Sequence, residues 1–326
     1  QHAKTAINLI CYKPEEVLAL FDRTKTGEPV SPLLGIETNI PIIGSLNDFP
    51  EANTFLLGVA TAGGGYPDEW RPIILEAISK GMTVVSGLHK YLSDDPEFVE
   101  AARKHKAKLV DIRKNDFKKV ATRKGIKETT LRIQTVGNDC SNGKMITSYE
   151  IALELKRRGK DAKFVATGQT GILLEGDGIP IDAVIADFVN GAAEEMVLRN
   201  QHHEILIIEG QASIIHPRYS SVTLGLLHGA MPQGLIMCYE MGREFTKNLD
   251  HVKIPPMKRI IELYEAMTAP LFPCKVIGFG INGRKFSQAE VDYERERIKE
   301  EFALPACDVI KHGPAELADA ILGFKY

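Results

Sequence analysis

A glycine-rich segment that ends in a lysine carries the residue types best suited to holding a phosphate group. Its members, in chain order, are Gly137, Asn138, Asp139, Cys140, Ser141, Asn142, Gly143, Lys144 and Met145. Glycines allow backbone N–H groups to turn inward, the N-terminus of a following helix supplies positive potential, and a lysine can reach the outer phosphates. We therefore expect this segment, the glycine loop, to bind a phosphate. A strand-to-helix turn without a ligand is the alternative.

Met145 occupies the position at which the ordinary phosphate loop places Ser or Thr, whose hydroxyl holds Mg²⁺. Thr147 points to another side of the predicted helix, and Ser148 lies one turn further from the phosphates. The missing hydroxyl favours a CoA-type pyrophosphate that is bound without cleavage, and we expect no metal site. ATP with Mg²⁺ stays the alternative, because five residues separate Gly137 from Gly143, a spacing that resembles dethiobiotin synthetase.

Other polar residues follow predicted strands, where open parallel sheets bind their ligands. Thr167, Gln169 and Thr170 can offer amides and hydroxyls to a carboxylate or phosphate, although a turn with satisfied hydroxyls explains them equally well. Glu209 ends a continuous apolar run and can hold Mg²⁺ through water or accept a proton from an attacking amine. Asp187 stands within an apolar stretch, where an acid is costly unless it is paired or functional.

Histidines and arginines complete the set of candidates. His216 and His228 are expected near one strand end, as proton acceptors or as structural residues. Arg218 or Arg243 can clamp the carboxylate of a substrate. In the first half, His89 closes a loop after a predicted strand and is a candidate substrate contact.

Length and composition indicate a two-domain globular protein. The chain has 326 residues, 44% hydrophobic and 25% charged. No apolar run approaches the roughly 20 residues that span a bilayer. A net charge of −3 argues against a general nucleic-acid binder. The five scattered cysteines lack zinc or disulfide spacing, and the chain shows no secretory leader. We expect a cytoplasmic protein without membrane or nucleic-acid partners.

Strand-length apolar runs alternate with helix-length amphipathic segments, which predicts an α/β protein with parallel sheets covered by helices. A basic stretch over 110–131 suits a connection, so we predict domains at 1–125 and 126–326. The predicted elements of the first domain are strands 55–60 and 82–86 and helices 68–80 and 95–106. Those of the second are helix 144–158 and strands 131–136, 163–167, 205–208, 235–239, 276–279 and 308–310.

These residues resemble the D-glutamate N-acetyltransferase-like family, long classed as a domain of unknown function. The resemblance covers nearly the whole chain, and Met145 looks like a feature of the family itself. Differences at Asn138, Asn142 and Ala212 leave the amino-acid acceptor open. The matching stretches are 86–89, 136–137, 139–141, 143–145, 166–172, 176–178, 182–188, 208–211, 216, 220, 222–223 and 228–229.

The resemblance implies a Rossmann-like parallel sheet followed by a P-loop-containing nucleoside triphosphate hydrolase-like parallel sheet. It also implies acetyl transfer from acetyl-CoA to the amino group of D-glutamate or a similar small acidic amino acid. We expect Lys144 and the loop amides to hold the CoA phosphates, and Glu209, His216 or His228 to take the proton of the amine. We also expect a homo-oligomer.

Two alternatives stay open. One is an ATP- and Mg²⁺-dependent ligase or kinase resembling dethiobiotin synthetase, with Glu209 and Asp187 on the metal. The other is a nucleotide-binding regulatory protein without turnover.

Overall fold

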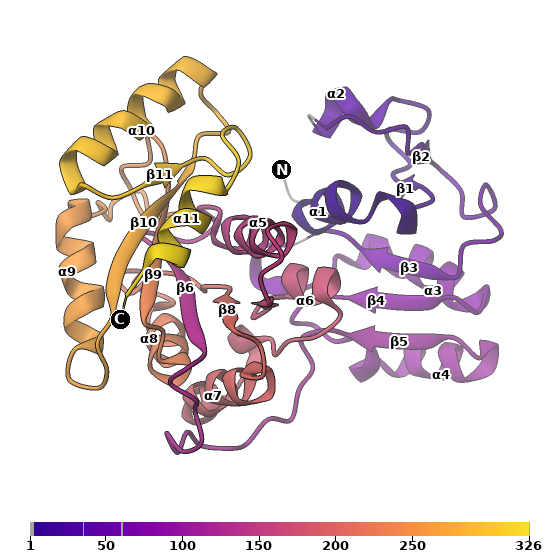
Figure 1. Cartoon of the computed structure of the whole chain (residues 1–326). Helices are drawn as coiled ribbons and strands as arrows, with labels where there is room; N and C mark the ends of the chain where they lie inside the picture. The colour runs from indigo at the N-terminus through magenta and orange to yellow at the C-terminus, as the bar shows by residue number, and fades with distance from the viewer. Residues whose placement is uncertain (1–2, 35, 60, 326) are drawn as a thin grey trace. The chain divides into compact units, whose positions relative to one another are not determined.

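The computed structural model describes residues 3–34, 36–59 and 61–325, and it forms two compact units. The first unit is the chain up to Lys114 together with Ile172–Gly176, and the second is Asn115–Gly171 with Asp177–Tyr326. In Figure 1 the indigo and violet strands belong to the first unit, and the magenta to yellow strands belong to the second. Both units are built from parallel strands and helices, which confirms the predicted fold class.

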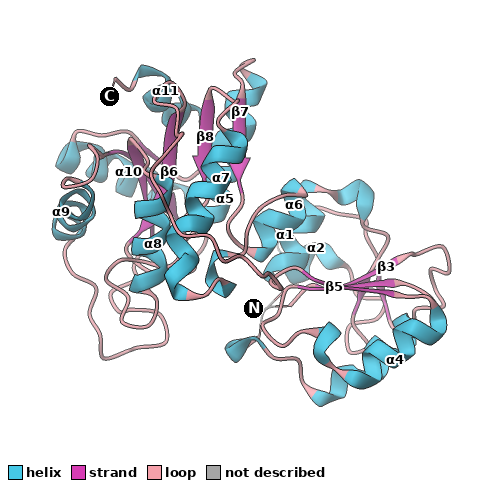
Figure 2. Ribbon diagram, turned by 90° about the horizontal axis from the view of Figure 1, so that it is seen from below, coloured by secondary structure: helices cyan, strands magenta, loops and turns pink. Residues whose placement is uncertain are grey.

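The first unit contains a three-stranded parallel sheet with the strand order β3-β4-β5. Figure 2 shows this sheet nearly edge-on, with α4 on one side. The predicted order of strands and helices is confirmed, while Ala60, at the end of the first predicted strand, lies outside the described residues. The elements are α1 (Lys4–Tyr12), β1 (Leu20–Phe21), α2 (Val30–Leu34), β2 (Ile42–Ile43), β3 (Thr54–Leu57), α3 (Arg71–Ser79), β4 (Thr83–Ser86), α4 (Pro96–His105) and β5 (Lys108–Asp111).

The second unit is built on a six-stranded parallel sheet with the order β11-β10-β9-β6-β8-β7. Its strands are β6 (Leu131–Gly137), β7 (Ala162–Val165), β8 (Ile205–Ile208), β9 (Gly234–Glu240), β10 (Lys275–Asn282) and β11 (Ala306–Cys307). Its helices are α5 (Lys144–Arg157), α6 (Gln169–Glu175, shared with the first unit), α7 (Val189–Asn200), α8 (Ser220–Ala230), α9 (Met257–Thr268), α10 (Gln288–Phe302) and α11 (Ala315–Gly323).

One predicted strand of this sheet is wrong. Residues 308–310 form a turn, because the carboxylate of Asp308 accepts hydrogen bonds from the backbone N–H groups of Ile310 (3.0 Å) and Lys311 (3.2 Å). The edge strand β11 lies just before this turn.

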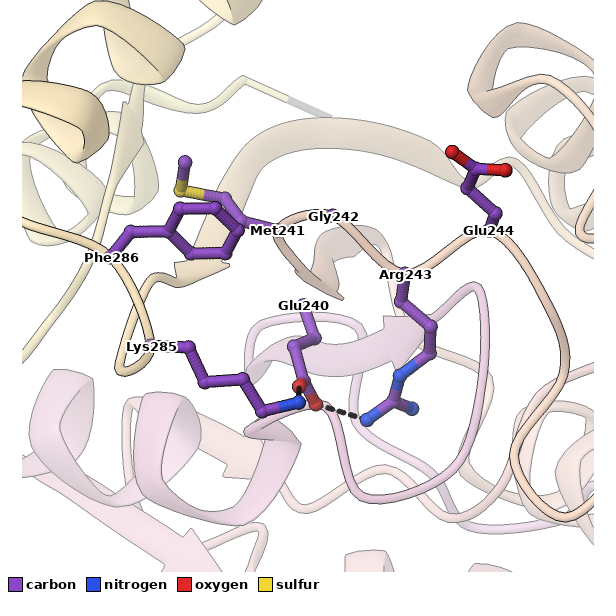
Figure 3. A pocket seen from close by; sticks show the side chains of 7 residues that line it. All are labelled: Glu240, Met241, Gly242, Arg243, Glu244, Lys285 and Phe286. Carbon is purple, nitrogen blue, oxygen red and sulfur yellow. Dashed lines mark hydrogen bonds and ion pairs between the residues drawn. The ribbon is translucent and has the colours of Figure 1, made fainter.

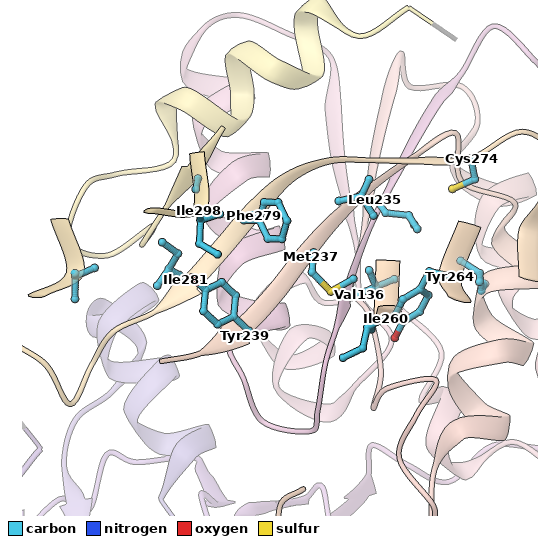
Figure 4. Packing of buried hydrophobic residues seen from close by; sticks show 14 residues of the cluster. Val136, Leu235, Met237, Tyr239, Ile260, Tyr264, Cys274, Phe279, Ile281 and Ile298 are labelled. Carbon is cyan, nitrogen blue, oxygen red and sulfur yellow. The ribbon is translucent and has the colours of Figure 1, made fainter. Parts of the chain in front are cut away.

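The core of the second unit explains why its strands are continuous apolar runs. Every residue of β8 and β9 is buried, since helices cover both faces of the sheet. On one face, Leu235, Met237 and Tyr239 of β9 pack in one cluster with Ile260 and Tyr264 of α9 (Figure 4). Among the described helices, none is long and apolar enough to cross a membrane.

A polar exception lies in the central strand. Gln134 of β6 is fully buried, and neither amide atom of its side chain has a hydrogen-bond partner among the described residues. A buried amide without a partner is costly, so this position works against stability.

The segment that follows Lys114 is anchored to α7. Glu194 is 4% exposed, and its carboxylate accepts hydrogen bonds from the backbone N–H of Thr122 (2.9 Å), the hydroxyl of Thr122 (3.0 Å) and the backbone N–H of Arg123 (2.7 Å). These bonds fix the segment although its lysines point to solvent. This segment belongs to the second compact unit, which begins at Asn115.

Candidate phosphate-binding site

The glycine loop joins the end of β6 to the start of α5, as the sequence predicts. A Cβ atom on Gly137 would fall 2.4 Å from Nδ2 of Asn142 and 2.9 Å from the carbonyl oxygen of Cys238, so only glycine fits there. Gly143 begins the helix with a φ of 106°. Asn142 supports the loop from inside, since its Nδ2 donates to the Cys238 carbonyl at 2.7 Å.

Lys144 turns back over this loop. Its ammonium donates to the carbonyl of Asp139 (2.8 Å) and to Oδ1 of Asn142 (3.0 Å), and the residue is only 6% exposed. Helix N-termini carry backbone N–H groups without intrahelical acceptors, together with the positive end of the dipole. The loop therefore combines a buried cation with a helix N-terminus, an arrangement that suits a phosphate.

The first turn of α5 offers no hydroxyl to a metal ion at the loop. Met145 is buried, and Ser148 donates its hydroxyl hydrogen bond to the carbonyl of Lys144 at 2.8 Å. Thr147 faces the neighbouring strand, because a Cβ on Gly280 would lie 2.9 Å from its methyl carbon. The helix-face argument made from the sequence thus agrees with the contacts of all three side chains.

Asp139, the acid of the loop, is held by a cation. Its Oδ2 accepts from Nη1 of Arg243 (2.8 Å) and from the backbone N–H of Lys247 (2.8 Å), and its side chain is fully buried. Arg243 also donates to the carbonyl of Cys140 at 2.6 Å. Arg243, predicted as a clamp for a substrate carboxylate, is therefore placed on the loop itself.

His216 lies beside the other oxygen of Asp139, with 3.8 Å between Nε2 and Oδ1. Its Nδ1 accepts the backbone N–H of Arg218 at 3.2 Å, which assigns the ring proton to Nε2. Burial lowers the pKa of His216, so the neutral ring is favoured at neutral pH. Neither ring nitrogen then offers a lone pair to a substrate amine.

Asp139, Cys140 and His216 also form the one group in the described part of the chain whose side-chain donor atoms, all within 4.8 Å of one another, could surround a metal ion. The chemistry of the group does not fit. A metal at Nε2 would require the ring proton on Nδ1, which already accepts a hydrogen bond. Burial raises the pKa of the Cys140 thiol, which opposes the thiolate that a metal needs.

Glu209 lies directly after β8. Its Oε2 accepts the backbone N–H groups of Thr167 (2.9 Å) and Gly168 (3.0 Å), where α6 begins. The next residue brings this strand end against the glycine loop, because a Cβ on Gly210 would fall 1.7 Å from the carbonyl of Thr135 and 3.1 Å from Cδ of Lys144. The structure therefore places Glu209 one residue from the contact with the lysine.

Thr167, the first predicted substrate contact after β7, is engaged with this acid. The hydroxyl of Thr167 donates to the backbone carbonyl of Glu209 at 2.8 Å and accepts from Nε2 of Gln211 at 2.9 Å. Gln169 and Thr170 begin α6, the first half-buried and the second buried. For Thr167 the contacts are those of a turn with a satisfied hydroxyl.

Two further predicted catalytic residues are His228 and Asp187. His228 is on the last turn of α8, a helix that runs antiparallel to the strands and away from their carboxyl ends. Its Nε2 bonds to the Met267 carbonyl at 2.9 Å. The expectation that His216 and His228 share one strand end is wrong, because a helix length separates them. Asp187 is exposed, so its carboxylate carries no burial cost there, and its catalytic role stays a prediction.

Two further candidates are on the surface. Arg218 is exposed, with an Nη2 contact of 3.5 Å to the Asn248 carbonyl. His89 is exposed in the first unit, and its backbone N–H donates to the carbonyl of Gly64 at 2.8 Å. Both stay predicted substrate contacts.

Two residues at the site were missed in the sequence. Tyr264 of α9 donates to the carbonyl of Gly137 (3.0 Å) and accepts the backbone N–H of Ile214 (3.1 Å), which ties the loop to the segment after β8. No motif marks it. Glu240 ends β9 and is 3% exposed. An acid after a buried apolar run, the signal used for Glu209, could have found it.

A parallel sheet whose central strand leads through a glycine loop into a helix defines a P-loop domain. The chain belongs to the DUF1611 family: residues 119–318 match the Domain of unknown function (DUF1611_C) P-loop domain, and residues 23–115 match the Domain of unknown function (DUF1611_N) Rossmann-like domain. The predicted family and its two domain types are confirmed.

Three similar proteins cover most of the chain. A D-glutamate N-acetyltransferase from Pseudoalteromonas sp. is 41% identical over 263 residues, which are 80% of this chain and 79% of the relative. A D-glutamate N-acetyltransferase from Tritonibacter scottomollicae is 36% identical over 272 residues, 83% and 81% of the two chains. A crystal structure of a DUF1611 family protein from Anabaena variabilis has a TM-score of 0.93 at 34% identity, covering 99% and 96%.

Proposed function

We propose that this protein is an N-acetyltransferase that moves the acetyl group of acetyl-CoA to the amino group of D-glutamate or a similar small acidic amino acid. The observation that carries the proposal is the name shared by two relatives that are 41% and 36% identical over about four-fifths of the chain. The glycine loop supports it, because the loop combines a phosphate grip with a buried methionine in place of a metal-binding hydroxyl.

In this proposal, Lys144 and the loop N–H groups bind the pyrophosphate of CoA, which is held and not cleaved. The amine attacks the thioester carbonyl only when it is neutral, so a base must take its proton. Glu209 is the better candidate, because a carboxylate has lone pairs to accept a proton and this residue directly precedes Gly210, which packs against Lys144, whereas Nδ1 of His216 already accepts a hydrogen bond and Nε2 carries the ring proton. The C–N bond forms as the C–S bond breaks, and the thiolate of CoA leaves.

The test is a rate assay with acetyl-CoA and D-glutamate in the presence of EDTA. We expect release of the CoA thiol together with N-acetyl-glutamate detected by mass spectrometry, and L-glutamate and D-alanine serve as acceptor controls. A parallel assay uses Mg-ATP and measures phosphate release. Metal-dependent phosphate release without thiol release across a panel of amino acids would establish the ligase or kinase alternative. Binding of CoA or ATP without turnover of either would favour the regulatory protein.

Met145→Thr sharpens this comparison, because it restores the hydroxyl that the ordinary loop uses on Mg²⁺. Acetyl transfer without a metal gains little from the hydroxyl, so the thiol-release rate of the variant should match that of the wild type. A site that cleaves ATP should gain from the new ligand. A large increase in Mg-ATP hydrolysis in the variant, with no thiol release in either protein, would contradict the acetyltransferase.

A further inference from the structure

A cavity of about 290 Å³ lies at the carboxyl ends of β9 and β10. Figure 3 shows Lys285 and Arg243 converging on Glu240 at its floor, with Met241 and Phe286 on another side. Arg243 links the cavity to the glycine loop, because the same guanidinium is 2.8 Å from Asp139 and 2.6 Å from the carbonyl of Cys140. Arg243 therefore lines the cavity and contacts the glycine loop as well.

The group of side chains around Glu240 has more positive than negative charge. Glu240 is the one carboxylate at its floor, with a side chain 2% exposed, and Lys285 (2.6 Å), Arg284 (3.8 Å) and Arg243 all pair with it. Glu244 also lines the cavity, but its carboxylate points away from this group in Figure 3. One buried anion thus faces three cations, and the side chains of Arg284 and Lys285 are 65% and 64% exposed.

The loop does not remove this excess. Asp139 pairs with Arg243 alone among these three cations, while the loop adds the ammonium of Lys144. Burial, followed by the neighbouring Arg243 guanidinium, lowers the pKa of Lys247, as expected where cations crowd together. An anion bound in the cavity would relieve this repulsion, and exposed guanidinium and ammonium groups are the side chains that bind phosphate.

We propose that Arg284 and Lys285, held in place by the buried Glu240, form a second phosphate subsite that binds the 3′-phosphate of CoA. The inference rests on the proposed function, and it names the part of the CoA molecule that the cavity recognises. In CoA the 3′-phosphate and the 5′-pyrophosphate leave the same ribose, so a protein that binds both needs two adjoining cationic sites. The glycine loop and this cavity are two such sites, joined by Arg243. A nucleoside triphosphate has no phosphate at the 3′ position, so the subsite would select CoA over ATP.

The experiment compares CoA with 3′-dephospho-CoA by isothermal titration. Wild type, Arg284→Ala, Lys285→Ala and the double variant are titrated with both ligands. Lys275→Ala is the matched control, because Lys275 is an exposed lysine paired with a glutamate at the start of β10, the strand that leads to Arg284 and Lys285, and so lies at the end away from the cavity. Arg243 is left intact, since its loss would strip the buried Asp139 and Glu240 of their shared partner.

We expect the wild type to bind CoA about tenfold to a hundredfold more tightly than 3′-dephospho-CoA, the range for losing a charge-assisted contact. The Arg284 and Lys285 variants should lose that preference by weakening CoA alone, and Lys275→Ala should keep it. Equal affinity of the wild type for both ligands would overturn the subsite and leave the acetyltransferase standing. A preference that survives in the double variant would overturn it in the same way. Absence of binding to either ligand would overturn both the subsite and the proposed function.

Discussion

Lys144→Ala is the sharpest test of the glycine loop. In the structure the ammonium donates hydrogen bonds to the carbonyl of Asp139 at 2.8 Å and to Oδ1 of Asn142 at 3.0 Å. Both of these acceptors are neutral, so losing the two bonds strands no charge at either of them. The substitution also removes the cost of burying an ammonium that is only 6% exposed. These effects oppose each other, and we expect the free energy of unfolding to change by no more than about 1 kcal/mol.

Binding should respond differently, because a phosphate would receive the full positive charge of Lys144. Loss of a hydrogen bond to a charged group costs about 1.5–3 kcal/mol, which weakens binding roughly tenfold to a hundredfold. Isothermal titration with CoA and with ATP measures the change, and urea unfolding measures the stability. Lys156→Ala, an exposed lysine in the last turn of the same helix, is the control. If Lys144→Ala binds both ligands as tightly as the control does, the loop is not the phosphate site.

Three further outcomes are expected. Glu209→Gln keeps an oxygen that can accept the N–H groups of Thr167 and Gly168, but it removes the base. CoA affinity should therefore stay unchanged while the acetyl-transfer rate falls about a hundredfold to ten-thousandfold. A wild-type rate in this variant would show that another residue is the base. Burial lowers the pKa of His216 below its ordinary 6.5, so the unfolded chain binds the proton first and stability is lost as pH falls below about 6.5. His216→Gln should flatten that loss in urea unfolding between pH 7.5 and 5.5, and parallel curves would contradict this. Gln134→Met removes a buried amide without a partner among the described residues, so it should raise the free energy of unfolding by about 1 kcal/mol; a lower denaturation midpoint would argue against it.

The sequence predicted most of the second unit's sheet because parallel strands buried on both faces are continuous apolar runs. β8 was found to the residue, and the start of α5 at Lys144 followed from the loop before it. The strand predicted at 308–310 failed because the Asp308 side chain bonds to the backbone just after it, a local competition that apolar content does not reveal.

The candidate site was predictable where a motif fixes distances along the chain, and less so elsewhere. The contacts of Lys144 within its own loop follow from sequence spacing. The separation of His216 and His228 depends on the length and direction of α8, which lies between them. The exposure of Asp187 depends on which side of a short turn faces solvent. Tyr264 reaches the loop from a distant helix, a tertiary contact with no local signature.

The anchoring of residues 122 and 123 to Glu194 determines where this chain can be cut. A fragment that begins at residue 126, where the basic stretch suggests a linker, would leave a buried carboxylate without the two N–H groups and the hydroxyl that satisfy it. An uncompensated buried charge costs about 3–5 kcal/mol, a large share of the stability of an ordinary domain. The family boundary at residue 119 keeps all of these donors. The basic stretch around residues 122 and 123 has the composition of a linker, but it is the first ordered segment of the P-loop domain. Any engineered fusion or deletion should preserve it.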